Sequence, residues 1–314
     1  MRLRILLTGS NGQVGADLAR LLPSIGELTA FNHASLDLTD TTALRRAVRD
    51  VRPNLIVNAA AYTKVDQAEQ EISAAFAVNA EAPATLAAEA KKIGAAIVHY
   101  STDYVFDGSK HVPYTENDPP NPVSVYGKSK LAGEEAIRAS GAPHLILRTA
   151  WVYAWRGRNF LLTILRLSTE REELRIVHDQ IGAPTLSREI AAGTVRILSA
   201  FAESVLDLDR FAAASGTYHM TARGEISWYE FAKAILTESA AVSTPLTWRD
   251  AATGGRPRVT RLVTPISTAE YPTPARRPAY SVLSNTRLLE TFGFELPGWR
   301  EQLRTLFSED PKVC

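Results

Sequence analysis

Short apolar runs alternate with alanine-rich, helix-favouring segments through the first half of this 314-residue chain. Such alternation is typical of a parallel sheet whose strands are buried on both faces by the connecting helices. The expected strands are LRILLTG, ELTAF, NLIVNAAA, AAIVHYSTD and HLILRTAWVY, and the expected helices are residues 14–22, TTALRRAVRDV, SAAFAVNAEAPATLAAEAKKIG and SVYGKSKLAGEEAIRAS. Four βα units in succession predict an α/β fold of the Rossmann type, a doubly wound parallel sheet.

The alternation of short apolar runs with helix-favouring segments becomes less regular after Tyr153. The segment NFLLTILRLSTEREELRIV predicts an amphipathic helix that runs into a short strand, and SREIAAGTVRILSAF and SWYEFAKAILTES predict helices around the strand GTYHMT. Residues 243–280 are rich in Pro and Gly and are expected to be loops. We therefore predict a mainly NAD(P)-binding domain over residues 1–222, with 150–175 contributing to a smaller C-terminal α/β substrate domain over residues 223–314.

Composition narrows the classes of function. The formal net charge is +1, so no basic excess favours nucleic acid or an anionic membrane. Cys314 is the single cysteine, which excludes an intrachain disulfide and a cysteine metal site. The N-terminal apolar run is read as a strand rather than a signal peptide, and no stretch approaches the roughly 18 apolar residues of a spanning helix. We expect a cytoplasmic protein that binds neither nucleic acid nor membrane.

The segment TGSNGQVG follows the first expected strand and opens a helix. Its glycines, Gly9, Gly12 and Gly15, are three apart. Glycine permits a tight turn, close approach of main-chain N–H groups to a pyrophosphate and close packing of helix on strand, although a plain βα turn remains an alternative reading. The spacing GxxGxxG points toward short-chain dehydrogenases of the extended kind. The expected cofactor contacts in this loop are Gly9, Asn11, Gly12, Gln13 and Val14.

The adenosine end of a dinucleotide usually meets an acidic residue at the end of the second strand. This chain has Asn32 and His33 there, so a ribose 2′-phosphate is not repelled, and we predict NADPH with NADH also possible. Asp37, followed by Leu38, either reaches the adenine or caps the next helix. Small residues after the third strand are expected to line the cofactor cleft, namely Ala59, Ala60 and Ala61.

The segment SVYGKSK places Tyr126 and Lys130 four residues apart, on one face of the expected helix. Upstream, a strand ends at Ser101 and Thr102, at the carboxyl edge of the sheet where ligands bind in such folds. Reduction of a carbonyl requires a proton donor, and a nearby ammonium lowers the pKa of a phenol toward neutrality. We expect Lys130 to lower the pKa of Tyr126 and to bind the nicotinamide ribose, while Thr102 orients the substrate oxygen.

The order TGSNGQVG, NAAAYTKVD, YSTDYVFDG, YGKSK, RTAWVYA and YPTPARRPAYSVLSN resembles the dTDP-4-dehydrorhamnose reductase family of extended short-chain dehydrogenases, from about residue 3 to about residue 306. The resemblance implies NADPH- or NADH-dependent reduction of the 4-keto group of dTDP-4-dehydro-6-deoxy-L-mannose to dTDP-L-rhamnose. It also implies a catalytic triad of Thr102, Tyr126 and Lys130, with Tyr126 and Lys130 contacting the cofactor as well.

Substrate contacts follow from the same resemblance. Residues that match them are Thr63, Val65, Tyr104 and Trp151, with Arg276 and Arg277 as candidates for the substrate diphosphate. Trp151 at a strand end is equally consistent with a core position, and Asn79 is read as structural. Some family members are magnesium-linked dimers, but no carboxylate cluster is evident here. We predict no metal and a monomer or homodimer.

Alternatives remain open on the same scaffold. A nucleotide-sugar epimerase or another 4-ketoreductase shares the fold. A dehydratase is disfavoured because Asp103 is followed by Tyr104, where resembling dehydratases have a glutamate. A non-catalytic regulatory subunit would retain the fold and lose the triad, and the triad residues are intact here.

Overall fold

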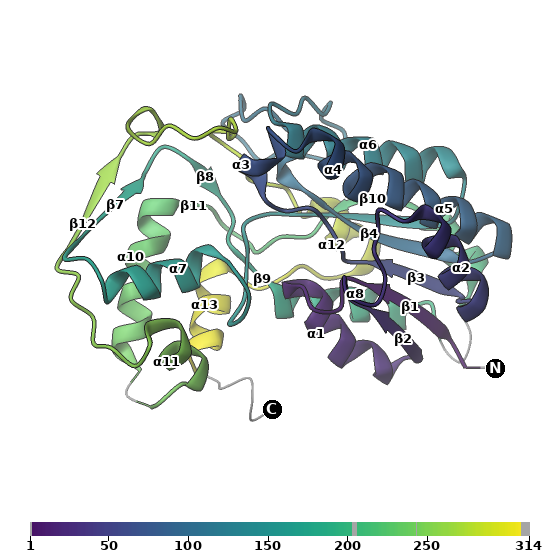
Figure 1. The fold of residues 1–314 in the computed structure, drawn as a ribbon, viewed down its shortest axis with the longest axis horizontal. Coiled ribbons are helices and arrows are strands. Elements are labelled where there is room, and N and C mark those ends of the chain that lie inside the picture. The colour runs from purple at the N-terminus through teal and green to yellow at the C-terminus, as the bar shows by residue number, and fades with distance from the viewer. Residues whose placement is uncertain (1, 203–205, 243, 309–314) are drawn as a thin grey trace.

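The computed structural model describes residues 2–202, 206–242 and 244–308, and Cys314 lies outside them. Its centre is a parallel sheet of six strands in the order β10-β5-β4-β3-β1-β2 (Figure 1). The strands are β1 (Arg4–Thr8), β2 (Glu27–Phe31), β3 (Leu55–Asn58), β4 (Ala96–Thr102), β5 (His144–Thr149) and β10 (Gly216–His219). Every strand predicted for the sheet is present, and the strand order reverses between β1 and β3.

Alternate residues of each strand face opposite layers of helices. Ile5 and Leu7 of β1 pack with α1 (Gln13–Leu21) and α8 (Ser187–Ser199). Leu6 packs instead with α2 (Thr41–Val51) and α5 (Ala82–Ile93), on the face that α6 (Val125–Ser140) also covers. Burial of both strand faces accounts for the continuous apolar runs, and the α/β fold prediction is confirmed.

The long helical segment predicted over residues 73–94 is interrupted. It consists of α4 (Ile72–Phe76), a π-helical segment over Ala77–Glu81, and α5. A short helix, α3 (Val65–Ala68), precedes it. A π-helical turn inserts one residue into the helical repeat and is frequent at functional sites. Here it brings Asn79 toward the end of β3.

A second lobe lies beside the sheet (Figure 1). Its core contains Leu161 of α7 (Phe160–Ser168), Phe231 of α10 (Trp228–Ala241) and Leu303 of α13 (Trp299–Ser308). The predicted helix that runs into a strand is α7 followed by β7 (Glu173–Val177). Short strands join the lobes, namely β6 (Val152–Tyr153), β8 (Ile181–Gly182), β9 (Thr185–Leu186) and β11 (Ile226–Ser227).

The expectation of loops throughout residues 243–280 is wrong in part. This region contains α11 (Thr247–Thr253) and β12 (Leu262–Ile266), which pairs with β7. In β12 only Ile266 is buried, Leu262 is exposed and Pro265 interrupts the strand, so it lacks the apolar alternation of a typical strand. α11 is only seven residues long and is followed by Gly254, whose φ of 64° suits glycine.

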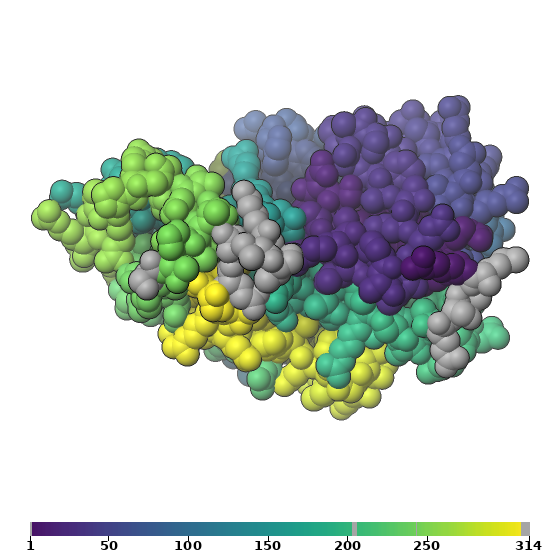
Figure 2. All heavy atoms as spheres, turned by 90° about the horizontal axis from the view of Figure 1, so that it is seen from below, coloured from purple at the N-terminus to yellow at the C-terminus, as the bar shows by residue number. Residues whose placement is uncertain are grey.

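The C-terminal segment contributes to both lobes. α12 (Thr286–Phe292) supplies Leu288 to the core beneath the sheet, which also includes Phe294 and Leu296. Figure 2 shows the yellow C-terminal part of the chain extending from beside the green lobe to lie against the teal part of the chain. α9 (Leu208–Ala213) adds Phe211 to the same core. The domain boundary between residues 222 and 223 stays a prediction.

Within the described ranges of the chain, no helix is both long enough and apolar enough to cross a membrane.

Candidate active site

The glycine loop joins β1 to α1 by a tight turn. Gly9 has a φ of +75°, and a Cβ there would lie 2.6 Å from the main-chain nitrogen of Ala60. A Cβ on Gly15 would lie 2.0 Å from the carbonyl oxygen of Gly9. Only glycine fits either position without movement of main chain.

The start of α1 is suited to an anion. The residue before the helix is Gly12, which has no side chain to cap the first-turn N–H groups, and the first turn contains no acidic residue. The helix dipole and these N–H groups together favour a negatively charged group such as a pyrophosphate. The loop therefore fits a dinucleotide. Asn11 is exposed and Val14 is half-buried, while Gln13 accepts a hydrogen bond from Asn159 at 2.8 Å.

The residues after β2 form a tight turn. Asn32 Oδ1 accepts from the main-chain N–H groups of Ala34 at 2.9 Å and Ser35 at 3.1 Å, and His33 is exposed. Asp37 does not cap α2, because Asp40 does so through Thr42 and Ala43. Asp37 instead accepts from Thr39, and the main-chain hydrogen bond from Thr39 lowers its pKa. The Leu38 side chain is buried in the core, so only its main chain is available to a ligand.

The end of β3 is held by Asn79. Its amide accepts from the main-chain N–H of Tyr62 at 2.9 Å and donates to the carbonyl of Tyr62 at 3.0 Å. It also donates to Ser129 Oγ of α6 at 3.0 Å. The structural reading of Asn79 is confirmed, since it ties the chain after β3 to α6. Ala59, Ala60 and Ala61 precede this tie and are half-buried.

Thr102, Tyr104 and Tyr126 come together where β4 ends. The rings of Tyr104 and Tyr126 meet edge to face with centroids 5.5 Å apart. Thr102 accepts from the N–H of Tyr104 at 3.2 Å and donates to Asp103 at 3.0 Å, and its hydroxyl lies close enough to Tyr126 to act on the pKa of the phenol. A Cβ on Gly127 would lie 2.2 Å from the carbonyl oxygen of Tyr104, so glycine beside Tyr126 permits this close approach of α6. Sequence reasoning did not identify Gly127.

Lys130 lies on α6, one turn after Tyr126, and is 2% exposed. Its Nζ donates to the carbonyl oxygen of Tyr100 at 2.6 Å and lies 3.2 Å from Nε2 of His99. Burial lowers the pKa of Lys130 to about 8, and the charge of Glu134 opposes that change. The amine is thus held toward β4, by residues that the sequence analysis did not single out.

The expectation that Lys130 lowers the pKa of Tyr126 is wrong for this structure. Burial raises the pKa of Tyr126 to about 12, with a smaller opposing effect from the Thr102 hydroxyl. The amine of Lys130 is directed at His99 and Tyr100 and not at the phenol. Burial also raises the pKa of Asp103 to about 6.

Trp151 has a backbone conformation that is rare for a bulky residue. Its φ is +47°, in the left-handed region, where strain often marks a functional position. Its indole stacks on Trp228 with centroids 3.4 Å apart and planes within 3°. A Cβ on Gly182 would lie 2.3 Å from the Trp151 ring, so that ring occupies the space between Gly182 and Trp228. The side chain of Trp151 remains half-buried rather than fully enclosed.

The other predicted substrate contacts lie around α3 and the loop before Tyr280. Thr63 is exposed and Val65 is half-buried. Arg277 forms a bidentate ion pair with Asp66 of α3, with distances of 3.0 Å and 2.7 Å, which offsets its charge. Arg276 is exposed, and no ion pair joins it to another residue in the described part of the chain.

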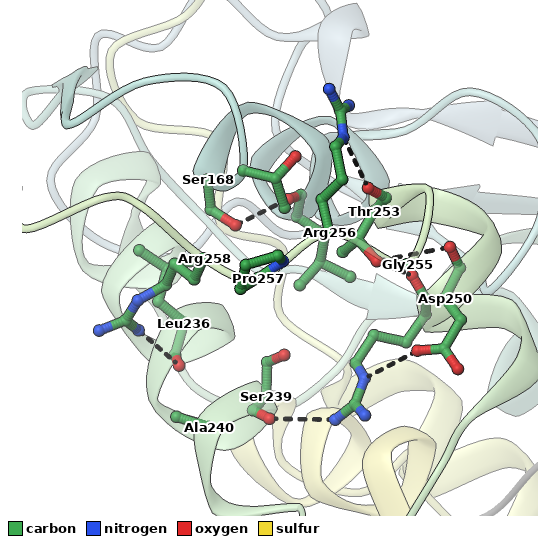
Figure 3. Close-up of a pocket in the computed structure, with 13 residues that line it drawn as sticks. Ser168, Leu236, Ser239, Ala240, Asp250, Thr253, Gly255, Arg256, Pro257 and Arg258 are labelled. Atoms are coloured by element: carbon green, nitrogen blue, oxygen red, sulfur yellow. Dashed lines mark hydrogen bonds and ion pairs between the residues drawn. The ribbon is translucent and has the colours of Figure 1, made fainter.

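The hollow drawn in Figure 3 lies away from these residues. It is formed in the second lobe by α7, α10, α11 and the loop through Arg256 and Arg258. None of the predicted site residues lines it. Among the residues with described positions, no group of three or more His, Cys, Asp and Glu side chains is arranged to hold a metal ion, and the expected absence of a metal stays a prediction.

Open sheets of this kind bind nucleotides at the carboxyl edge where the strand order reverses. That edge carries the glycine loop after β1 and the Thr and Tyr side chains beside β4, on a chain with the Tyr-x-x-x-Lys pattern of short-chain dehydrogenases. The chain is thus an α/β oxidoreductase of the extended short-chain dehydrogenase class.

The chain belongs to the dTDP-4-dehydrorhamnose reductase family. A family model described as "RmlD substrate binding domain" matches residues 2–311. The dTDP-4-dehydrorhamnose reductase of Burkholderia thailandensis is 50% identical, over 95% of this chain and 96% of that protein. The Escherichia coli K12 enzyme of the same name is 39% identical, over 98% of each chain.

Solved structures agree with this assignment. A dTDP-4-dehydrorhamnose reductase from Bacillus anthracis, crystallised in complex with NADP, is 34% identical with a TM-score of 0.83, over 98% of this chain and 99% of that one. A Thermus thermophilus UDP-glucose 4-epimerase complex with NAD is 19% identical with a TM-score of 0.75, over 98% of each chain, and that likeness concerns the fold alone.

Proposed function

We propose that this protein reduces the 4-keto group of dTDP-4-dehydro-6-deoxy-L-mannose (dTDP-4-dehydro-β-L-rhamnose) to give dTDP-L-rhamnose, with NADPH as the reductant and NADH also accepted. The observation that carries the proposal is the convergence of Thr102, Tyr104 and Tyr126 at the same carboxyl edge of the sheet as the glycine loop. Membership of a family whose relatives bear that enzyme name supports it.

The residues that would hold the cofactor lie along one edge. The first turn of α1 would bind the pyrophosphate, with Gly9, Gly12 and Gly15 giving it close access to main chain. Asn32, His33, Asp37 and Leu38 would surround the adenosine. Ala59, Ala60 and Ala61 would leave room beside the cofactor, and Lys130 would bind the nicotinamide ribose. When bound, the cofactor supplies a hydride to the carbonyl carbon.

Tyr126 is the proton donor in this proposal. As the carbonyl oxygen gains charge, the phenol transfers its proton to that oxygen, and solvent returns a proton to the phenolate afterwards. A pKa of about 12 keeps the phenol protonated across the physiological range. Thr102 would hydrogen-bond the same oxygen and fix its position.

The sugar would lie between the two lobes. Thr63, Val65, Tyr104 and Trp151 are the proposed sugar contacts, with the indole of Trp151 presenting a rigid apolar surface. Arg276 is the stronger candidate for the diphosphate, because Arg277 is already paired with Asp66. Oligomeric state, cytoplasmic location and the absence of nucleic-acid binding remain predictions.

One assay tests the proposal. The absorbance of NADPH or NADH is followed after the protein is added to dTDP-4-keto-6-deoxyglucose. The assay is run with and without the 3,5-epimerase that converts this compound into the proposed substrate, dTDP-4-dehydro-6-deoxy-L-mannose (the lyxo isomer). We expect oxidation only with the epimerase present. No oxidation in either mixture, with a folded protein that binds cofactor, would overturn the proposal in favour of a non-catalytic role. Conversion of a nucleotide sugar without net oxidation would favour an epimerase.

Cofactor preference is tested by Asn32→Asp. The carboxylate keeps the oxygen that accepts from Ala34 and Ser35, so the turn is preserved, and it adds a negative charge where a 2′-phosphate would lie. We expect KM for NADPH to rise at least about tenfold, roughly 1.4 kcal/mol, with KM for NADH unchanged or lower. Asn54→Asp is the matched control, because Asn54 accepts from the main-chain N–H of Arg4 at the amino-terminal ends of the strands, opposite the carboxyl edge. Equal changes for both cofactors would contradict this placement.

The Trp151 contact is tested by Gly182→Ala. A Cβ at this position would lie 2.3 Å from the indole and force it to move. We expect KM for the sugar nucleotide to rise about tenfold, as overpacking typically costs about 1–3 kcal/mol, with the Kd for NADPH unchanged. Gly298→Ala is the control, since the nearest atom to its Cβ would be 3.9 Å away. A KM like that of the unmodified protein would remove Trp151 from the sugar site.

A further inference from the structure

Three polar side chains form a row across the sheet just before its carboxyl edge. Thr8, Asn58 and His99 are direct neighbours on β1, β3 and β4, and each is at most 1% exposed. Thr8 Oγ1 donates to Asn58 Oδ1 at 2.6 Å, and Asn58 Nδ2 lies 3.0 Å from His99 Nδ1. His99 Nε2 lies 3.2 Å from Lys130 Nζ. The row thus ends on the lysine of the Tyr-x-x-x-Lys pattern.

The row interrupts an otherwise apolar layer. Two residues earlier on the same strands, Leu6, Ile56 and Ile97 occupy the same face and the same register, packed under α2 and α5. Continuing that apolar layer at Thr8, Asn58 and His99 would serve packing better, because a buried polar group costs stability unless it is fully hydrogen-bonded. The change from an apolar to a polar row occurs beside Lys130, which itself is buried.

A neutral imidazole has one N–H and one lone pair, so the row has a direction. When Asn58 donates to Nδ1, Nε2 carries the hydrogen and donates to a neutral Lys130 amine. When the Asn58 amide is reversed, its oxygen accepts from Nδ1–H, and the Nε2 lone pair accepts from a Lys130 ammonium. Both directions satisfy the imidazole, and they correspond to the two protonation states of the lysine.

Few other charges act on this pair. Burial and the charge of Lys130 lower the pKa of His99 well below its ordinary value, so the ring is neutral across the working range. Glu134, one turn beyond Lys130 on α6, favours the ammonium and is itself paired with Arg148 of β5. Other ionisable groups around the site are Tyr126 at the start of α6, Asp103 and Tyr104 after β4, and Glu69, which accepts from the N–H of Val125. The π-helical segment presents the uncharged Asn79.

We propose that Thr8, Asn58 and His99 form a positioning row that holds the amine of Lys130 by hydrogen bonding in both of its protonation states, reversing direction when the amine changes state. The inference builds on the proposed reductase function, in which Lys130 binds the nicotinamide ribose of the cofactor. His99 is a positioning residue in this scheme, since it acts through Lys130 and not on the substrate.

The row is tested first without any turnover. In 15N-histidine-labelled protein, the shifts of Nδ1 and Nε2 report which nitrogen carries the hydrogen, and His99→Gln identifies the signals of His99 among the six histidines. We expect the two His99 shifts to exchange over the pH range around 8 in which Lys130 titrates, with the ring neutral on both sides. A tautomer that stays fixed through that range would overturn the proposal. This result does not depend on reductase activity, so it separates failure of the row from failure of the proposed function.

Variants give shifts of opposite sign in the pH profile of kcat/KM. The part of the profile that is set by the pKa of Lys130 is called the Lys130 limb. His99→Leu removes the acceptor for the ammonium and should move this limb to lower pH by about one unit. The reason is that a charged group loses more from a missing hydrogen bond than a neutral one. Asn58→Asp favours Nδ1–H and the ammonium, and should move the limb to higher pH. His99→Gln, whose carbonyl can accept from Lys130, should restore the limb.

Thr260→Val is the matched control, because this buried hydroxyl donates to the carbonyl oxygen of Arg171 in the second lobe, away from the row. Its limb should coincide with that of the unmodified protein. If the His99 and Asn58 variants fold and bind cofactor, yet all keep the same limb, His99 serves packing only and the proposal fails. If His99→Leu does not fold, the Asn58→Asp variant still tests the proposal: a shift of its limb to higher pH supports the row, and no shift or the opposite shift overturns it.

Discussion

Replacement of Tyr126 by phenylalanine is expected to lower kcat by about a hundredfold to ten-thousandfold, the usual contribution of a positioned general acid. The phenol is the group at the sheet edge that meets Thr102 and remains protonated at working pH, because burial raises its pKa to about 12. Phenylalanine keeps the edge-to-face contact with Tyr104 and removes only the hydroxyl. Steady-state kinetics with the lyxo isomer and NADPH measures the loss.

The Kd for NADPH separates proton donation from cofactor binding. We expect fluorescence titration to give a Kd close to that of the unmodified protein, because the hydroxyl acts mainly on the substrate oxygen. Tyr218→Phe is the matched control, since Tyr218 lies on the edge strand β10 and its hydroxyl donates to the carbonyl of Ala214, away from the site. A cofactor affinity that falls as far as kcat would show that Tyr126 serves the cofactor and would contradict its role as proton donor.

The sheet and the glycine loop were predictable because each leaves a local pattern. Strands buried on both faces, such as ILL in β1 and AIV in β4, require continuous apolar residues. The loop needs glycine at Gly9 and Gly15 because main chain approaches their Cα atoms, and that need can be read without knowing the partner atoms. Thr102 and Tyr126 follow from the rule that parallel strands present their carboxyl ends at one edge.

The direction of Lys130 was not predictable in the same way. Spacing places Tyr126 and Lys130 on one helical face. The partners of the Lys130 amine depend instead on the register of the sheet, which places His99 beside it. His99 lies inside a strand that reads as apolar, and its neighbour Asn58 is 41 residues away. The one available signal was that Thr8, Asn58 and His99 are polar residues near the ends of three apolar runs.

The stacking partner of Trp151 could not be predicted from any local sequence pattern either. Trp228 begins a helix in another lobe and is brought to Trp151 by the pairing of β11 with β8, strands of two residues each. Such short pairings carry no periodicity, and their register is set by tertiary packing. The same holds for β12, whose single partner β7 lies about ninety residues earlier in the chain, beyond the reach of local propensity.

Glu134→Gln is expected to reduce the free energy of unfolding by about 3–5 kcal/mol, the usual cost of leaving one partner of a buried ion pair uncompensated. Glu134 is fully buried and holds Arg148 by two hydrogen bonds of 2.9 Å and 2.7 Å, with Arg138 as a further partner. Glutamine has nearly the same shape, so the loss measures charge rather than packing. Urea unfolding at pH 7, followed by circular dichroism, gives the difference.

The pH dependence of that difference follows from the pKa of Glu134. Burial alone would raise this pKa, but the hydrogen bonds and charge of Arg148 outweigh burial, and the net shift is downward. A lowered pKa contributes stability that is present above the unfolded value near 4.5 and is lost as pH falls through the folded value. The gap between the unmodified protein and Glu134→Gln should therefore narrow below about pH 4.

Two further variants decide whether the buried charge is the cause. Glu230→Gln removes a carboxylate whose side chain is 50% exposed beside Lys233, and should change stability by less than about 1 kcal/mol. Glu134→Leu combined with Arg148→Met removes both charges, and should recover most of the loss because neither group is left unpaired. A double variant as unstable as Glu134→Gln alone would place the cost in packing between α6 and β5, since removal of the stranded guanidinium would then have relieved nothing.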